Sequence, residues 1–467
     1  MCRAFVRPFV PVALLAFLVA VSACQISSSA NPLPKEFFYF PTGLVHADST
    51  AAPDGVLYVA NANIDKRYEA GSVVAINLSR VGAPGDGLPA FGGAGAGTAP
   101  KQIPALNIEA PGVVSVTSFA GDMAARSLLT GGLHLFVPSR SEGSKLQGLV
   151  ASPLSIAGAQ PELSCLTPAT SESRDCGALA PSLVVNENNE TATPRAPSPI
   201  GVAVSAAGDV YVTSAQHADS PRGSGLAAHA YVVRVDAQNP TVDNSNFIDL
   251  GLGPTSAVAT GARWVYVTGR FSTYNNATVF YVLRLVGRDG TVVPAGLENE
   301  FRVADARGVD LVRDESRIYI AGRFPDTLIV ASIVGAQTSA PTLHVVRSVP
   351  LPEGPQVVKV LERAGRGPVV AVTSTTAGVV SFYDDDSGQL ASQVFGVGLQ
   401  PYGISVDFKG AGARLYVSNF GDGRIAVIDI ADLGRPQEAR LVAHLGASVQ
   451  VCLSRANKDA TCEGAPP

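Results

Sequence analysis

The chain has 467 residues, of which 46% are hydrophobic and 16% are charged, and its formal net charge is −5. The apolar content is enough for a large folded core. The mild negative charge provides no chain-wide attraction to nucleic acid or to an anionic membrane surface, so we expect no nucleic-acid partner.

The first predicted element is a secretory signal peptide over residues 1–23. Arg3 and Arg7 make its start positive, and the apolar stretch Phe9–Val21 that follows is too short to span a bilayer as a helix. No later stretch of the sequence is long enough to span one either. We therefore expect a protein that is exported across a membrane.

The segment Val21-Ser22-Ala23-Cys24 resembles a bacterial lipobox. The resemblance implies cleavage before Cys24 and acylation of this cysteine, with residues 24–37 forming the lipidated end and a tether. Ordinary secretion with cleavage near Ala23 is the alternative. Gln25 is not acidic, and an acidic residue at this position favours inner-membrane retention in Gram-negative bacteria. The expected location is therefore the cell envelope, with the outer membrane favoured over the inner one.

From about residue 38 to about residue 448 the chain repeats one pattern of β-strands. In the best copy, Pro401–Leu433, β-rich runs are separated by Gly-rich turns, and Leu441–Leu445 adds a short fourth run. Four antiparallel strands per copy predict an all-β fold, a seven-bladed β-propeller. The seven copies of the second-strand motif are Leu57–Asn61, Leu135–Ser139, Val210–Ser214, Val265–Gly269, Ile318–Gly322, Val370–Ser374 and Leu415–Asn419.

The spacing of these copies favours blades over an ordinary β-sandwich, which is the alternative. Tyr266, Tyr319, Ala371 and Tyr416 are separated by 53, 52 and 45 residues, which suits a blade repeat. A sandwich does not require the same strand-opening residues at such spacing. The first two intervals are longer, so we expect insertions in blades 1 and 2, at about residues 80–110 and 153–198.

The segments Leu415–Ile430 and Leu57–Asp65 resemble the YVTN-type family of propellers, also called YncE-like or surface-layer-type. The resemblance extends over most of the mature chain and implies a seven-bladed propeller. Members of this family range over structural, binding and enzymatic roles, so the resemblance implies no single function.

Four cysteines remain once Cys2 leaves with the signal peptide and Cys24 becomes the anchor. We predict two local disulfides, Cys165–Cys176 and Cys452–Cys462, the second in a C-terminal tail at residues 449–467. A metal site built from the same four cysteines is disfavoured, because no CxxC spacing occurs and no histidine is near them.

The loops after the second strands are the expected ligand positions, because propellers bind ligands around their central channel. The Gly-Arg-Phe triplets at 269–271 and 322–324 place an arginine at the same point of blades 4 and 5. Two such guanidinium groups could bind a carboxylate or a phosphate, or each could tether a neighbouring blade. The candidate ligand-binding residues are Asp65, Arg67, His217, Asp219, Arg222, Arg270 and Arg323.

Two classes of function remain. The six histidines show no HxH or HxxxH spacing, and neither a GxSxG motif nor a P-loop occurs, so we expect no metal, no cofactor and no catalytic residue. The expected function is a non-catalytic binding or scaffold module for a protein or a glycan. The alternative is a lactonase-like propeller hydrolase or lyase, in which channel-facing carboxylates such as Asp310 and Asp407 would act with a divalent cation.

Overall fold

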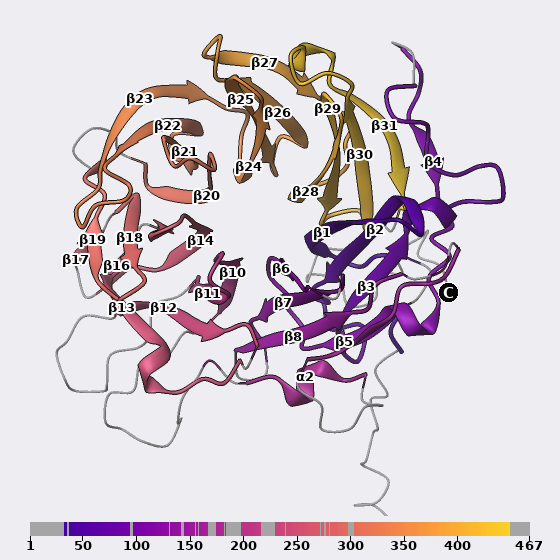
Figure 1. Cartoon of the computed structure of the whole chain (residues 1–467), viewed down its shortest axis with the longest axis horizontal. Coiled ribbons are helices and arrows are strands. Elements are labelled where there is room, and N and C mark those ends of the chain that lie inside the picture. Colours follow the sequence, from indigo (N-terminus) through magenta and orange to yellow (C-terminus); the bar gives the residue numbers. More distant parts are fainter. Residues whose placement is uncertain are drawn as a thin grey trace, which may run out of the picture.

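The computed structural model describes residues 32–34, 37–93, 97–129, 131–141, 144–154, 156, 158–166, 174–181, 183, 198–215, 229–238, 240–270, 272–274, 277–279, 281–297 and 303–448. Within these residues, seven sheets of antiparallel strands are arranged in a ring around a central channel (Figure 1). The chain is therefore a seven-bladed β-propeller, as the repeat predicts. No helix in the described part of the chain is long and apolar enough to cross a membrane.

Each blade is built from strands that follow one another in the chain, with the first strand innermost. Blades 1 to 3 contain β1 (Pro41–Ser49), β2 (Ala52–Asn61), β3 (Gly71–Asn77) and β5 (Val113–Val116); β6 (Ala124–Ser127), β7 (Leu133–Ser139), β8 (Lys145–Ala151) and β9 (Leu163–Cys165); and β10 (Pro199–Val204), β11 (Asp209–Ser214), β12 (His229–Asp236) and β13 (Phe247–Leu252). Blades 4 and 5 contain β14 (Thr255–Thr260), β15 (Trp264–Gly269), β18 (Leu283–Gly287) and β19 (Val292–Pro294); and β20 (Asp305–Leu311), β21 (Arg317–Arg323), β22 (Thr327–Val334) and β23 (Thr342–Pro350). Blades 6 and 7 contain β24 (Pro355–Arg363), β25 (Arg366–Ser374), β26 (Val379–Asp384) and β27 (Gln389–Val394); and β28 (Pro401–Lys409), β29 (Gly412–Asn419), β30 (Arg424–Ile430) and β31 (Arg440–Leu445).

All seven predicted second-strand motifs lie on second strands. These strands are the most buried, because sheet neighbours flank them and adjacent blades cover both of their faces; all eight residues of β29 are buried. That position explains why the motif is a run of apolar residues rather than a strict alternation. We call the face where first strands begin and second strands end the upper face, and the opposite one the lower face.

Neighbouring blades approach closely where their first strands begin. Gly403 in the Pro-Tyr-Gly opener of blade 7 has no room for a side chain, because a Cβ there would lie 2.2 Å from the carbonyl oxygen of Thr42 in blade 1. Gly201 faces Ser256 of blade 4 in the same way, at 2.6 Å. The repeated opener is therefore a packing requirement between blades.

A hydroxyl group near the end of the second strand also joins each of several blades to the next one. Ser418 donates to the carbonyl oxygen of Thr42 at 2.8 Å, and Thr373 donates to that of Tyr402 at 3.0 Å. Thr213 and Thr268 donate to the carbonyl oxygens of Ser256 and Arg307. The serine or threonine of the second-strand motif thus bridges blades 3 to 4, 4 to 5, 6 to 7 and 7 to 1.

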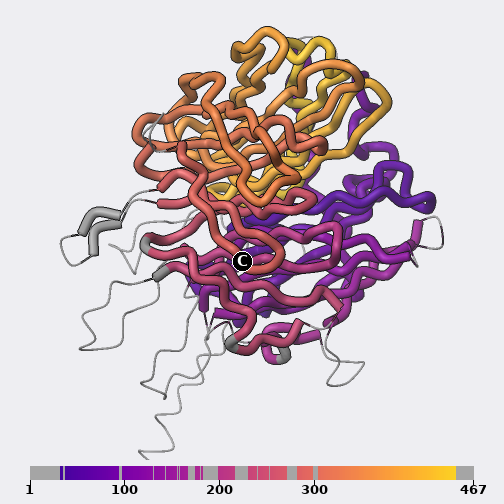
Figure 2. The backbone as a smooth tube through the Cα atoms, turned by 60° about the vertical axis from the view of Figure 1, so that its left-hand side comes forward, coloured from indigo at the N-terminus to yellow at the C-terminus, as the bar shows by residue number. Residues whose placement is uncertain are grey.

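The first predicted insertion closes the ring. A short strand within it, β4 (Lys101–Ile103), pairs in parallel with β31, so a segment of blade 1 becomes the fifth strand of blade 7. Figure 2 shows the N-terminal blade in indigo beside the C-terminal strands in yellow. The first and last blades of the ring are joined in this way.

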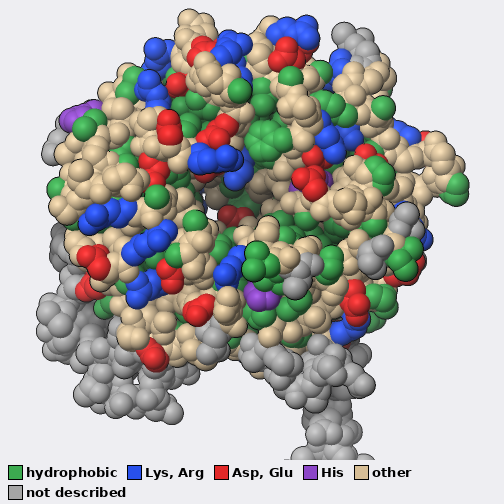
Figure 3. All heavy atoms as spheres, in the orientation of Figure 1, with side chains coloured by type: hydrophobic (Ala, Val, Ile, Leu, Met, Phe, Trp, Pro, Cys, Tyr) green, Lys and Arg blue, Asp and Glu red, His purple; other side chains and the backbone are tan. Residues whose placement is uncertain are grey.

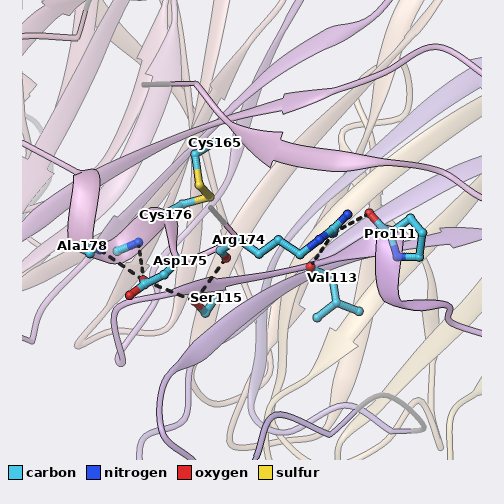
Figure 4. Close-up of a disulfide and its surroundings, with 9 residues drawn as sticks. Pro111, Val113, Ser115, Cys165, Arg174, Asp175, Cys176 and Ala178 are labelled. Atoms are coloured by element: carbon cyan, nitrogen blue, oxygen red, sulfur yellow. Dashed lines mark hydrogen bonds between the residues drawn. A yellow bond between two sulfur atoms is a disulfide. The ribbon is translucent and has the colours of Figure 1, made fainter. Parts of the chain in front are cut away.

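The second predicted insertion includes part of blade 2 itself. Its β9 is the outermost strand of that blade, and the four-residue helix α2 (Cys176–Leu179) follows. A disulfide joins Cys165 on β9 to Cys176 on α2, with 5.1 Å between the Cα atoms (Figure 4). Beside it, the Arg174 guanidinium donates to the carbonyl oxygens of Ala110, Pro111 and Val113, which fastens the segment to blade 1.

Smaller elements decorate the ring. In blade 4 the chain between the second and third strands forms a separate hairpin of β16 (Ser272–Tyr274) and β17 (Ala277–Val279). Short 3-10 turns occur at Leu78–Arg80, Ala110–Gly112, Asn244–Asn246 and Pro436–Glu438.

Candidate functional site

The innermost strands of the blades line a central cavity of about 700 Å³. Side chains of both signs reach it, among them Asp122, Arg307, Asp310 and Lys359. Figure 3 shows the hollow at the centre of the molecule, with basic and acidic groups around its rim. The channel is therefore a water-accessible space whose walls are apolar in part and which also contains charged side chains.

The middle of the channel contains an ion pair between blades 5 and 6. Lys359 Nζ lies 3.6 Å from Asp310 Oδ2, and the same carboxylate oxygen accepts the backbone N–H of Val360 at 2.9 Å. The charge of Asp310 raises the pKa of Lys359, with a smaller contribution from Asp122, so this lysine is a permanent cation. Its side chain is 44% exposed because the channel is open to water.

Asp122, at the start of blade 2, has a charge that changes near neutral pH. Burial raises the pKa of its carboxyl group to about 6, while the Met123 amide that it accepts and the Lys359 cation act in the opposite direction. The channel therefore becomes more negative as the pH rises through this range.

Arginines gather at the upper mouth of the channel. Asp305 opens β20, and its two carboxylate oxygens accept from Arg270 Nε at 3.1 Å and from Arg307 Nε at 2.7 Å. Arg270 follows the second strand of blade 4, so this bond ties blade 4 to blade 5. Burial, followed by the neighbouring charge of Arg307, lowers the pKa of Arg270.

Arg323 is the counterpart of Arg270 one blade further on. Its guanidinium donates to blade 6 through the carbonyl oxygens of Pro355 at 2.9 Å and Gly354 at 3.2 Å. It also donates to Gln356 Oε1 at 2.8 Å and to Thr375 Oγ1 at 3.0 Å. The two arginines lie on the same face and act on each other electrostatically. Their contacts favour the tether between blades, which was one of the two roles that the sequence left open.

Arg140 was not singled out by its sequence. It follows β7 at the upper face, and its charge acts on both Tyr402 of blade 7 and Arg270 of blade 4. Its Nε is buried and has no hydrogen-bond acceptor among the described residues. A single arginine outside any repeated triplet carries no signal that could have identified it.

The other predicted ligand residues are dispersed. Asp65 and Arg67 lie in the loop between β2 and β3, where they pair with each other at 3.4 Å. His217, Asp219 and Arg222 lie outside the described residues, and so do Cys24, Cys452 and Cys462.

The carboxylates named for a hydrolase are not brought together. Asp310 lines the channel, whereas Asp407 does not, although its neighbours on β28 do. The Asp407 side chain is only 1% exposed and lies 3.6 Å from His46 Nε2. Among the described residues, the group of metal-ligating side chains close enough to share an ion is His46, Asp48 and Asp407, which lies outside the channel lining.

No family model matches the chain, and no curated protein sequence matches it. Among solved structures it is similar to hydrazine synthase of Kuenenia stuttgartiensis, with 10% identity, a TM-score of 0.49 and coverage of 87% of this chain and 99% of that one. It is also similar to apo AztD from Citrobacter koseri, with 12% identity, a TM-score of 0.41 and coverage of 88% and 87%. A functionally unknown protein from Desulfotomaculum acetoxidans DSM 771 has 10% identity, a TM-score of 0.46 and coverage of 81% and 95%. These likenesses are too weak to carry an argument about function.

Proposed function

We propose that the protein is an exported β-propeller of the YVTN type that binds a protein or glycan partner at the upper mouth of its channel, without catalysing a reaction. The partner would present an acidic group, a carboxylate or a phosphate, to the arginines there. The observation that carries this proposal is the buried Nε of Arg140, a donor with no acceptor among the described residues. A buried, unused donor costs free energy, which an acceptor on a ligand would recover.

The balance of charge at the mouth supports an anionic ligand. Arg140, Arg270, Arg307 and Arg323 act on one another there, and the carboxylates that act on Arg270 and Arg323 are Asp305 and Asp326. Among the described residues, four guanidinium groups stand against these two carboxylates and Asp122, which acts on Tyr402 together with Arg140 and Arg307, so positive charge is in excess. Since Asp305 and the blade 6 contacts occupy three of these arginines, Arg140 is the one with a donor to spare.

We further propose that Cys24 is acylated and that the propeller is held at the envelope membrane, with the outer membrane favoured. The support is the lipobox-like Val21–Cys24 sequence alone. In that arrangement residues 24–37 would tether the propeller to the membrane, and the channel mouth would be presented to soluble or wall-bound partners.

Binding would be tested with the tagged mature chain carrying Cys24→Ser, so that it stays soluble. Titration calorimetry would measure the affinity of this chain for partners captured from solubilised outer membrane and for a panel of acidic glycans. We expect Arg140→Gln to weaken binding about tenfold or more, because a charge-assisted hydrogen bond is lost. The remaining affinity should fall with added salt.

The matched control is Arg435→Gln, an exposed arginine that pairs with Asp432 and Glu438 away from the channel. Equal affinity of the Arg140→Gln variant and the unmodified chain for every partner would refute the binding site. If both arginine variants lost affinity equally, the cause would be the general surface charge and not a binding site at Arg140.

A further inference from the structure

The strongest unassigned cluster lies near the lower face, at the junction of blades 7 and 1. His46 and Asp48 are two residues apart on β1, and Asp407 faces them from β28. One ligand atom from each of the three lies within 4.8 Å of the others. We propose that this cluster is a binding site for one divalent cation of the Zn²⁺ type, which would join the first and last blades.

The buried carboxylate is the first reason. The Asp407 side chain is 1% exposed, and its Oδ1 has no hydrogen-bond partner in the described part of the chain. Lys409 Nζ lies 2.8 Å from Oδ2 and partly compensates the charge, but Oδ1 has neither a hydrogen bond nor an ion pair among these residues. Buried carboxylates are otherwise hydrogen-bonded or bind metals.

The spacing of the donor atoms is the second reason. His46 Nε2 lies 3.6 Å from Asp407 Oδ2 and donates a hydrogen bond to the carbonyl oxygen of Asp54 at 3.1 Å, so a bound ion would take the place of this proton. In a tetrahedral Zn²⁺ site with bonds of about 2.0–2.1 Å, neighbouring ligand atoms are about 3.3 Å apart. The edge between His46 and Asp407 is therefore close to this length, and an oxygen of the exposed Asp48 lies within 4.8 Å of both ligand atoms and can supply the third ligand.

The surroundings hold the imidazole in place for this role. The ring of His46 stacks on that of Tyr416, with 5.4 Å between centroids and 13° between planes. The His46 backbone N–H donates to Ser405 Oγ at 2.7 Å, which fastens β1 to β28. Gly55, with φ +80°, lets the neighbouring backbone approach, because a Cβ there would lie 2.2 Å from His46 Nε2.

Lys409 is the internal competitor of the ion. Its side chain is 27% exposed, so it can swing into solvent when a divalent cation takes its place beside Asp407. His46 and Asp48 also line a cavity of about 590 Å³ between blades 1 and 2, which provides a route for a hydrated ion. An imidazole with two carboxylates suits Zn²⁺ better than Ca²⁺, which prefers oxygen ligands.

The sequence does not predict this site, because His46 and Asp407 are 361 residues apart and the ligands form no local motif. It also lies outside the channel, so it is independent of the binding role proposed above.

The test uses the mature chain with any histidine tag removed and residual metal stripped by chelator. Zn²⁺ alone would be titrated by calorimetry, and the melting temperature would be followed with and without it. We expect one Zn²⁺ per chain, at least tenfold weaker binding for Asp48→Asn, and tighter binding for Lys409→Gln because the competing ammonium is gone. Since Asp48 is exposed, its variant should fold as the unmodified chain does without metal.

Glu162→Gln, an exposed carboxylate on blade 2, is the matched control and should bind Zn²⁺ as the unmodified chain does. The proposal is overturned if the stripped chain binds no Zn²⁺ at about 100 µM metal. It is also overturned if Asp48→Asn and Lys409→Gln leave the affinity unchanged, since the ion would then bind elsewhere. Failure of the acidic-partner experiment would leave this result untouched.

Discussion

At the scale of single residues, the channel shows how burial sets charge. Asp122 and Asp310 are both aspartates of the channel lining, and burial raises the pKa of Asp122 to about 6. Asp310 pairs with Lys359 and accepts the Val360 N–H with one oxygen. Asp122 is buried, accepts the backbone N–H of Met123, and has Lys359 as a more distant cation. Burial with few partners is therefore what lets the Asp122 carboxyl group change its charge near neutral pH.

Asp122 therefore makes stability depend on pH in a definite direction. Its carboxyl has a pKa of about 6 in the folded state, against an ordinary value of 3.8, so between these values the folded state holds more protons. The free energy of unfolding should fall as the pH rises through this window and then level off. In Asp122→Asn this loss is absent, and we expect the variant to be more stable by about 1–3 kcal/mol above pH 6, with the difference vanishing toward pH 4.

Urea unfolding from pH 4.5 to 8 would measure this effect. The Asn side chain keeps an oxygen for the Met123 amide, so the comparison isolates the charge. A stability difference that is the same at every pH would show that Asp122 does not titrate in this window.

At the scale of elements, the insertion after β3 acts as a clasp on blade 7. Besides the pairing of β4 with β31, Arg414 and Asp429 form a two-bond ion pair at 2.7 and 2.8 Å with both side chains essentially buried. Arg414 also donates to the Pro89 carbonyl oxygen at 2.9 Å, and the Gly92 N–H donates to Asp429 at 3.1 Å. The insertion is therefore held through a charged pair that belongs to blade 7.

Removing one member of that pair should loosen the clasp and the blade together. We expect Arg414→Met to lower the free energy of unfolding by about 3–5 kcal/mol, because Asp429 would remain buried without its counter-ion. Limited proteolysis should then cut near Pro89, which loses its hydrogen bond.

The double variant Arg414→Met, Asp429→Leu is the control for an uncompensated charge. It should recover much of the stability, since no ion remains buried. Resistance of the single variant to both urea and protease would contradict the clasp.

At the scale of the whole molecule, the ring is joined by the same bond at several blade boundaries, including the one between the chain's two ends. Between blades 7 and 1, the Ser418 hydroxyl accepts the Gly403 N–H and donates to Thr42 O, each at 2.8 Å. Blades 7 and 1 do not follow one another in the chain, so side-chain bonds and the β4 clasp hold them together.

Ser418→Ala should therefore weaken the closure of the ring. It removes a buried donor and leaves the Thr42 carbonyl oxygen and the Gly403 N–H without this partner, so we expect a loss of about 1–3 kcal/mol in unfolding free energy. Hydrogen exchange should rise first in β1 and β28. Ser339→Ala, an exposed serine, is the control and should change stability by no more than about 0.5 kcal/mol. Unchanged exchange in β1 and β28 would show that this hydroxyl does not hold the ring.

The sequence by itself determined the blade. Alternating and apolar runs separated by Gly-rich turns specify four antiparallel strands locally, so the seven second strands and their order could be predicted. The Cys165–Cys176 disulfide could be predicted as well, because its two cysteines are close in the chain and the loop is short. Each of these features depends on neighbours within one repeat.

Only the tertiary structure decided what joins one repeat to another. The period of a strand says which residues share a face, but not which distant strand that face will meet. For this reason the sequence did not show that β4 pairs with blade 7, or that Arg270 binds Asp305 and Arg323 binds blade 6. Nor did it show that the Nε of Arg140 has no acceptor among the described residues at the channel mouth. The meeting of His46 with Asp407 has the same cause, because closing the ring brings the first and last blades together.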